Sequence, residues 1–202
     1  MIDCHVLVDP CRDASAVLAQ LAAEPVNLHI APARPGRISA ARAAAIRAGS
    51  APYVCWVDDD DQIAPGIFSR LLAALEQNPE ACGVYCREAR VDVSGRVLGV
   101  SPPAGWRWSI DDMIDQHPRV HHIAVMRRET VLPLLDAMQR WPMVGDQWLI
   151  WMQAQFGPWQ LLDEIGYTWR RHAAQVTASA TITKELAQAK QDARQRLGLA
   201  GN

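Results

Sequence analysis

Residues 53–61 read YVCWVDDDD, an unbroken apolar run that is followed at once by four aspartates. The run from Tyr53 to Val57 shows no alternation with polar residues, which is typical of a strand that is buried on both faces of a sheet. In open α/β sheets, ligands bind outside the carboxyl ends of the strands. This stretch therefore predicts a central strand with a candidate binding site at its end.

Short apolar runs and alanine-rich segments alternate around this strand. We predict two further strands and three helices, at 4–8 and 27–31 and at 13–23, 39–48 and 67–77. Ser39 is the expected N-cap of the second helix. Repeated strand–helix–strand units indicate an α/β fold with a mainly parallel sheet that is flanked by helices.

Beyond residue 80 the pattern changes to closely spaced strands. We predict four strands and two helices there, at 82–86, 90–93, 97–100 and 121–126 and at 129–139 and 146–156. His121 and His122 are expected to face opposite sides of their strand, which makes them a poor pair of metal ligands. Most tryptophans of this half, such as Trp148 and Trp151, are expected in the core.

The C-terminal segment from Ile182 to Leu197 carries its apolar residues on one stripe, and Gly198 follows it. We therefore divide the chain into a domain at 1–177 and a C-terminal amphipathic helix at 178–202. The stripe has to be buried, either across the interface of a homo-oligomer or back over the domain.

Composition excludes several classes of protein. The 202 residues include 20 Lys+Arg and 22 Asp+Glu, for a formal net charge of −2, which argues against nucleic-acid binding through bulk charge. No apolar run approaches the ~20 residues of a transmembrane segment, and the N-terminus lacks the pattern of a secretory signal. Five cysteines without a CxxC pair fit reduced thiols, so we expect a cytoplasmic protein.

The aspartate run indicates a site for a divalent cation. On an extended chain Asp58 and Asp60 point the same way, and two carboxylates about 7 Å apart repel each other by roughly 2 kcal/mol at an effective dielectric of about 20. A hard cation such as Mg²⁺ or Mn²⁺ offsets this repulsion. Two alternatives are a solvated acidic turn and the aspartate cluster of a metal-dependent phosphotransferase or nucleotidyltransferase.

The pattern over residues 36–65 resembles the nucleotide-sugar glycosyltransferases of family 2, which have the GT-A fold. The matching positions are Gly36, Ala41-Arg42, Ala48-Gly49, Tyr53 to Val57, Asp58 to Asp61 and Pro65. The resemblance implies that Arg42, Asp58 and Asp59 bind the nucleotide sugar. It also implies that Asp60 coordinates Mn²⁺ or Mg²⁺ on the diphosphate.

Three other segments resemble the same family. Asp146, in Gly145-Asp146-Gln147-Trp148-Leu149, matches the general base of the family's Glu-Asp-x-x-Leu, although its place at a helix start also fits a helix N-cap. Residues 167–172 are similar to a late strand whose histidine, here His172, completes the metal shell, with Arg171 beside the diphosphate. Asp9, after the strand at 4–8, matches an aspartate that meets the nucleotide base. The resemblance covers residues 4–177.

The sequence departs from the family at four places. No strand and nucleotide-binding loop are found ahead of the strand that Asp9 follows, Ala43 replaces an Asn, Gly145 replaces a Glu, and Pro10-Cys11-Arg12 replaces Asp-Gly-Ser. The resemblance implies an inverting, metal-dependent sugar transfer from a UDP-sugar to a glycan or other hydroxyl acceptor. The departures leave open a degenerate, non-catalytic relative that binds a glycan or a partner protein at the same site.

Overall fold

The computed structural model describes residues 1–116, 119–171 and 180–199. The strands are β1 (Ile2–Val8), β2 (Val26–Pro32), β3 (Tyr53–Asp58), β4 (Gln62–Ile63), β5 (Gly83–Val91), β6 (Val97–Ser101), β7 (Ala124–Arg127) and β8 (Trp159–Arg170). The helices are α1 (Ser15–Ala22), α2 (Ile38–Ala48), α3 (Ile67–Glu76), α4 (Ile110–Asp115), α5 (Arg128–Val131), α6 (Leu135–Met138), α7 (Gly145–Met152) and α8 (Ala180–Arg196). Short 3-10 turns cover Leu132–Leu134 and Gln153–Gln155.

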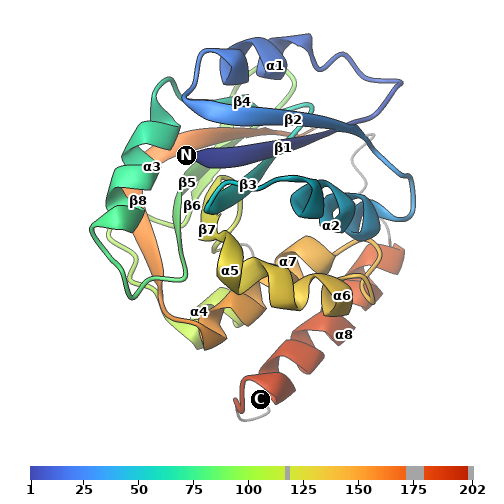
Figure 1. Cartoon of the computed structure of the whole chain (residues 1–202), viewed down its shortest axis with the longest axis vertical. Coiled ribbons are helices and arrows are strands. Elements are labelled where there is room, and N and C mark those ends of the chain that lie inside the picture. The colour runs from blue at the N-terminus through green and yellow to red at the C-terminus, as the bar shows by residue number, and fades with distance from the viewer. Residues whose placement is uncertain (117–118, 172–179, 200–202) are drawn as a thin grey trace.

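The described strands form one sheet in the order β2-β1-β3-β7-β5-β8-β4, and β6 pairs with β5 outside this path. The α/β class, the flanking helices and the C-terminal helix are confirmed (Figure 1). The sheet is mixed rather than mainly parallel, because β7 runs antiparallel to both β3 and β5. The short apolar run of β7 carries no local pattern that specifies its direction, so the sequence gives no sign of this inversion.

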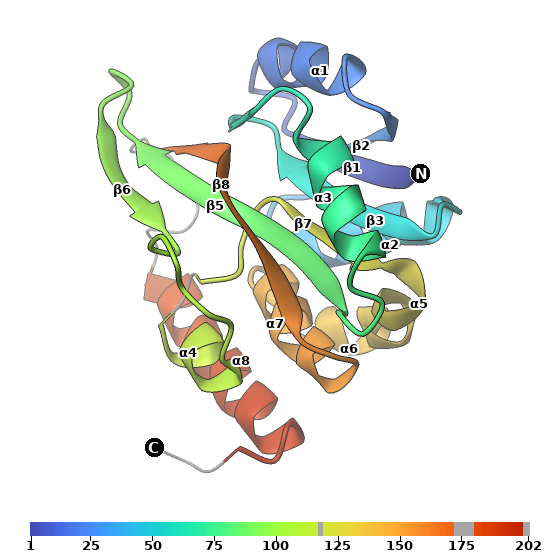
Figure 2. The same cartoon turned by 90° about the vertical axis from the view of Figure 1, so that its left-hand side faces the viewer.

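Two segments differ from their predicted form. The predicted strands at 82–86 and 90–93 are one strand, β5, which pairs with β6 in the predicted hairpin and with β8 along its length (Figure 2). Ser39 is not an N-cap, since α2 begins after Arg37. Instead the Ser39 hydroxyl donates to the carbonyl of Trp141 at 2.5 Å and accepts from the amide of Gly145 at 3.1 Å. Ser39 therefore fixes the start of α2 against the start of α7.

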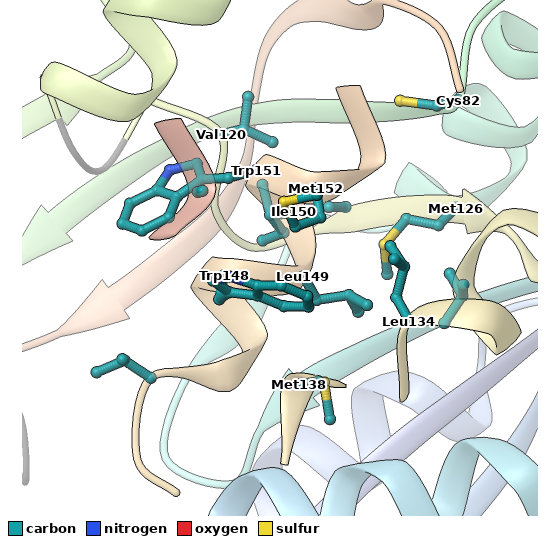
Figure 3. Packing of buried hydrophobic residues seen from close by; sticks show 14 of the residues in the cluster. Cys82, Val120, Met126, Leu134, Met138, Trp148, Leu149, Ile150, Trp151 and Met152 are labelled. Carbon is teal, nitrogen blue, oxygen red and sulfur yellow. The ribbon is translucent and has the colours of Figure 1, made fainter. Parts of the chain in front are cut away.

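The two faces of the sheet carry separate hydrophobic clusters. In β3, Cys55 and Val57 point toward the side of α1 and α3, whereas Val54 and Trp56 point toward the side of α2, α4, α7 and α8. This confirms that β3 is buried on both faces. Figure 3 shows part of the second cluster, in which Trp148 and Trp151 of α7 are fully buried as predicted.

Helix α8 packs back over the domain, which is one of the two predicted alternatives. Its residues Ile182, Ala189 and Ala193 are buried in the same cluster as α7. Polar contacts surround them: Lys190 pairs with Asp115 of α4 at 2.8 Å. The buried residues of the apolar stripe are thus covered by the same chain. A homo-oligomer through this helix stays a prediction. No helix in the described ranges is long and apolar enough to cross a membrane.

Glu185 of α8 accepts hydrogen bonds from the backbone amides of Met143 and Val144, at 2.8 and 3.1 Å, just before α7 begins. We expect Glu185→Ala to lower the free energy of unfolding by about 1–2 kcal/mol, because these amides lose their acceptor. The matched control is Gln188→Ala, an exposed position on the same helix, with an expected change within about 0.5 kcal/mol. Urea denaturation of both variants checks this, and equal losses would contradict the role of Glu185.

Candidate functional site

The four aspartates at the end of β3 point in different directions. The chain turns directly after Asp58, so the prediction that Asp58 and Asp60 point the same way is wrong. Asp58 contacts α2 and the segment before β7, while Asp59 and Asp60 face the loop after β1. Asp61 faces β8. Asp59 and Asp60 share Arg12, while Asp58 and Asp61 have other partners, so the run ties four parts of the chain to the end of β3.

Arg42 of α2 joins Asp58 to Asp146. One guanidinium nitrogen donates to Oδ1 of Asp58 at 2.6 Å, and the other donates to Oδ2 of Asp146 at the start of α7. The guanidinium also lies 5.3 Å from the ring centroid of Trp56. Ala41 and Ala43 on either side of Arg42 are buried as well, so this part of α2 lies in the interior of the protein. Arg42 and Asp58 belong to the pattern at residues 36–65 and Asp146 to a separate segment, and the structure brings the three together.

The charges in this group stabilise one another. Burial disfavours the charge of Arg42, but Asp146 and Asp58 outweigh it and raise the pKa of Arg42 above its ordinary value. Burial likewise raises the pKa of Asp58, but His122 and Arg42 outweigh it and hold the pKa of Asp58 well below its ordinary value. The Asp58 side chain is still 37% exposed, so a ligand can reach this anion.

Asp146 lies in the first turn of α7 and is not its N-cap, which is Val144. Its Oδ1 accepts from the backbone amide of Gln147 at 2.8 Å. Close packing explains the glycine at position 145, because a Cβ there would lie 2.5 Å from both the carbonyl oxygen of Met138 and Oγ of Ser39. A glutamate therefore does not fit at 145 in this packing, and the glycine lets α7 approach α2 closely enough for Arg42 to reach Asp146.

The loop after β1 packs against the aspartate run, because β1 pairs with β3 in parallel register, with Leu7 opposite Asp58. Buried Asp59 accepts from the backbone amide of Asp9 at 2.7 Å. Arg12 had no role predicted from the sequence, yet one of its guanidinium nitrogens donates hydrogen bonds to Asp59 at 3.2 Å and to Asp60 at 2.6 Å. The structure thus brings Asp9, Asp59 and Asp60 together around Arg12.

Asp61 fixes β8 to the end of β3. The hydroxyl of Tyr167 donates to its Oδ2 at 2.7 Å and the backbone amide of Arg170 donates to its Oδ1 at 2.8 Å. Burial, together with the charge of Asp58, raises the pKa of Asp61 to about 8. Arg171 is exposed, and its guanidinium lies 5.1 Å from the ring centroid of Trp169. His172 lies outside the described residues, so its predicted ligand role is left as a prediction.

His121 and His122 lie on the same side of the chain, and the prediction that they face opposite sides is wrong. Their ring centroids are 4.1 Å apart. His122 Nε2 lies 3.3 Å from Asp58, and His121 Nδ1 lies 2.6 Å from Oε2 of buried Glu88. Strand alternation does not apply to them because β7 begins only at Ala124. Burial lowers the pKa of His121, but Glu88 outweighs it and raises the pKa above its ordinary value. No sequence pattern pointed to Glu88.

A divalent cation fits this site only if a ligand supplies part of its coordination. Within residues 1–116, 119–171 and 180–199, no group of three or more His, Cys, Asp or Glu side chains is arranged to hold a metal ion. Mg²⁺ is usually bound by one or two carboxylates together with substrate phosphates and water. Asp58 and Asp60 offer such hard oxygens, but Arg42 holds Oδ1 of Asp58 and Arg12 holds Oδ2 of Asp60. A cation at Asp60 therefore needs the phosphate oxygens of a ligand to complete its coordination.

The comparisons with known proteins give a family and a fold. The model of Glycosyl transferase family 2 matches residues 6–132. No curated protein sequence matches the chain. Among solved structures, S. aureus TarS 1–349 in complex with UDP-GlcNAc aligns with a TM-score of 0.64 at 13% identity, covering 93% of this chain and 66% of that one.

Two further alignments agree on the fold. S. aureus TarS 1–349 alone aligns with a TM-score of 0.63 at 14% identity and covers 84% of this chain, which spans 60% of the length of that structure. Mannosyl-3-phosphoglycerate synthase from Rubrobacter xylanophilus aligns with a TM-score of 0.58 at 10% identity, covering 100% of this chain and 76% of that one.

Proposed function

The chain belongs to glycosyl transferase family 2, and we propose that it transfers a sugar, with inversion, from a nucleotide-sugar donor to an acceptor hydroxyl. The observation that carries the proposal is the contact of Arg42 with both Asp58 and Asp146, which joins a donor-side carboxylate to a candidate base. The UDP-GlcNAc complex of TarS supports a UDP-sugar as the donor. A glycan or another hydroxyl compound is the proposed acceptor.

Inverting transfer needs a base on the acceptor and positive charge on the leaving group. We assign the base to Asp146, whose side chain is 22% exposed. Arg42 fixes its Oδ2, while Oδ1 can accept the acceptor proton beside the amide of Gln147, since each carboxylate oxygen has two lone pairs. Asp58 orients the donor from the opposite side of Arg42. Positive charge for the leaving diphosphate comes from a divalent cation on Asp60 when one is bound.

The remaining predicted residues take supporting roles in this proposal. Asp9 meets the nucleotide base, Arg171 approaches the diphosphate, and His172 is the proposed second ligand of the metal. Asp59 is buried and accepts the amide of Asp9, so its role is to hold the loop of Asp9 rather than to touch the donor. We further propose a cytoplasmic location for the protein.

Thermal-shift measurements with UDP, GDP and UDP-GlcNAc, each with and without Mn²⁺, test the proposal. We expect UDP with Mn²⁺ to raise the melting temperature, since a ligand at 100 times its Kd stabilises the folded state by about 2.7 kcal/mol. Mn²⁺ alone and UDP alone are expected to give smaller shifts. A protein that responds to none of these nucleotides would contradict the proposal and favour a non-catalytic relative that binds a glycan or partner protein.

A further inference from the structure

Arg12 occupies the carboxylate that is proposed to hold the divalent cation. Its Nη1 lies 2.6 Å from Oδ2 of Asp60 and 3.2 Å from Oδ1 of Asp59, and its Nε lies 4.0 Å from Asp9. Burial opposes the charge of Arg12, but Asp60 and Asp59 outweigh it and raise the pKa of Arg12. Arg12 is therefore positively charged, at a position where the resemblance to family 2 implies a serine.

A guanidinium and a divalent cation compete for one carboxylate oxygen, because both are cations and repel each other when they lie within a few ångströms. The Arg12 side chain is 29% exposed and that of Asp60 is 21% exposed, so the pair lies at the surface of the site and can separate. A separated Arg12 needs a new anion, and a diphosphate on the cation offers oxygens that suit a guanidinium. The backbone of Arg12 is held by its amide, which donates to the carbonyl of Asp9 at 2.9 Å.

We propose that Arg12 is a displaceable counter-cation of Asp60 that couples metal binding to diphosphate binding, an inference that rests on the proposed function. Without ligand, Arg12 neutralises Asp59 and Asp60 and competes with the divalent cation. When nucleotide is present, Arg12 moves to the diphosphate and leaves Asp60 to the cation. Metal and nucleotide therefore bind together much more tightly than either binds alone.

The test is a binding cycle on the full chain with Mn²⁺ and UDP. The variant is Arg12→Gln, and Arg47→Gln is the control, which removes the same charge from an arginine that is 43% exposed and pairs with Asp136 of α6. Free Mn²⁺ is measured by electron paramagnetic resonance, and UDP affinity by calorimetry with and without Mn²⁺. Neither readout depends on catalytic turnover.

We expect Arg12→Gln to bind Mn²⁺ alone about 3- to 10-fold more tightly, because the competing hydrogen bond and charge are gone. The factor by which Mn²⁺ raises UDP affinity is expected to be about 10-fold or more in the parent and about 3- to 10-fold smaller in Arg12→Gln, in which only the direct contact of the cation with the diphosphate couples the two ligands. By linkage the reciprocal factor changes equally. Arg47→Gln should match the parent in both. Arg12→Lys keeps the positive charge without the planar guanidinium, so its Mn²⁺ affinity and coupling factor should lie between those of the parent and of Arg12→Gln. This variant keeps the inference testable if Arg12→Gln fails to fold.

Two outcomes are kept apart by this design. If UDP and Mn²⁺ bind cooperatively but Arg12→Gln changes neither the affinity for Mn²⁺ alone nor the coupling factor, the role of Arg12 is overturned and the proposed function stands. If UDP binds to no protein in the series under any condition, the proposed function fails and the inference falls with it.

Discussion

Asp146→Asn is expected to lower the turnover of sugar transfer by about 10²- to 10⁴-fold while leaving donor affinity nearly unchanged. Asparagine keeps the shape of the side chain and its Oδ1 can still accept the amide of Gln147, which lies at 2.8 Å in the parent. It cannot accept a proton from the acceptor hydroxyl at neutral pH. Its Nδ2 then faces Arg42, which loses one charged hydrogen bond but keeps its pair with Asp58, so the loss of stability is expected to be about 1.5–3 kcal/mol.

The control for this variant is Asp136→Asn, at a side chain that is 91% exposed and lies on α6 away from the site. Transfer rate, UDP affinity and melting temperature are measured on both variants. A purely structural role for Asp146 also predicts a lower melting temperature, but with nearly full turnover. In that case the pair of half-buried His121 and buried Glu88 becomes the next candidate for the base, since His121 Nδ1 and Glu88 Oε2 lie 2.6 Å apart beside the same site.

Asp60→Asn is expected to weaken Mn²⁺-dependent UDP binding by on the order of 100-fold, because a neutral amide is a poor ligand for a hard cation and even outer-shell partners of a metal contribute 10- to 100-fold. The melting temperature of the ligand-free protein should change little, since the ion pair that is lost with Arg12 is partly exposed. Calorimetry with and without Mn²⁺ measures this. Unchanged metal-dependent binding would remove Asp60 from the proposed metal site.

Combining this variant with Arg12→Gln gives a double-mutant cycle. If Arg12 acts on the cation through Asp60, then Arg12→Gln should tighten Mn²⁺ binding in the parent and have no such effect in Asp60→Asn. An equal tightening in both backgrounds would mean that Arg12 acts by general charge rather than by occupying Asp60. The cycle therefore separates displacement at one carboxylate from long-range repulsion.

Much of the fold could be predicted because its signals are local. The apolar run of β3, the alanine-rich helix α2 and the stripe of α8 each lie within one short segment, and the structure has all three. The directions of the strands could not be predicted in the same way. The direction of β7 depends on the two strands between which it lies, and its apolar run of Ala124, Val125 and Met126 carries no pattern that sets a direction.

The sequence by itself determined which local elements carry the candidate site residues. These are a buried strand that ends in aspartates, an arginine in the helix before it, and an aspartate at the start of a later helix. These features belong to short segments, so they can be recognised in the sequence without knowledge of the fold. Only the tertiary structure decided which charges meet, because Arg12 and Asp60 are 48 residues apart, Glu88 and His121 are 33 apart, and Arg42 and Asp146 are 104 apart. Such pairs depend on strand order and on close approaches such as that of α7 to α2 at Gly145, and no local pattern encodes them.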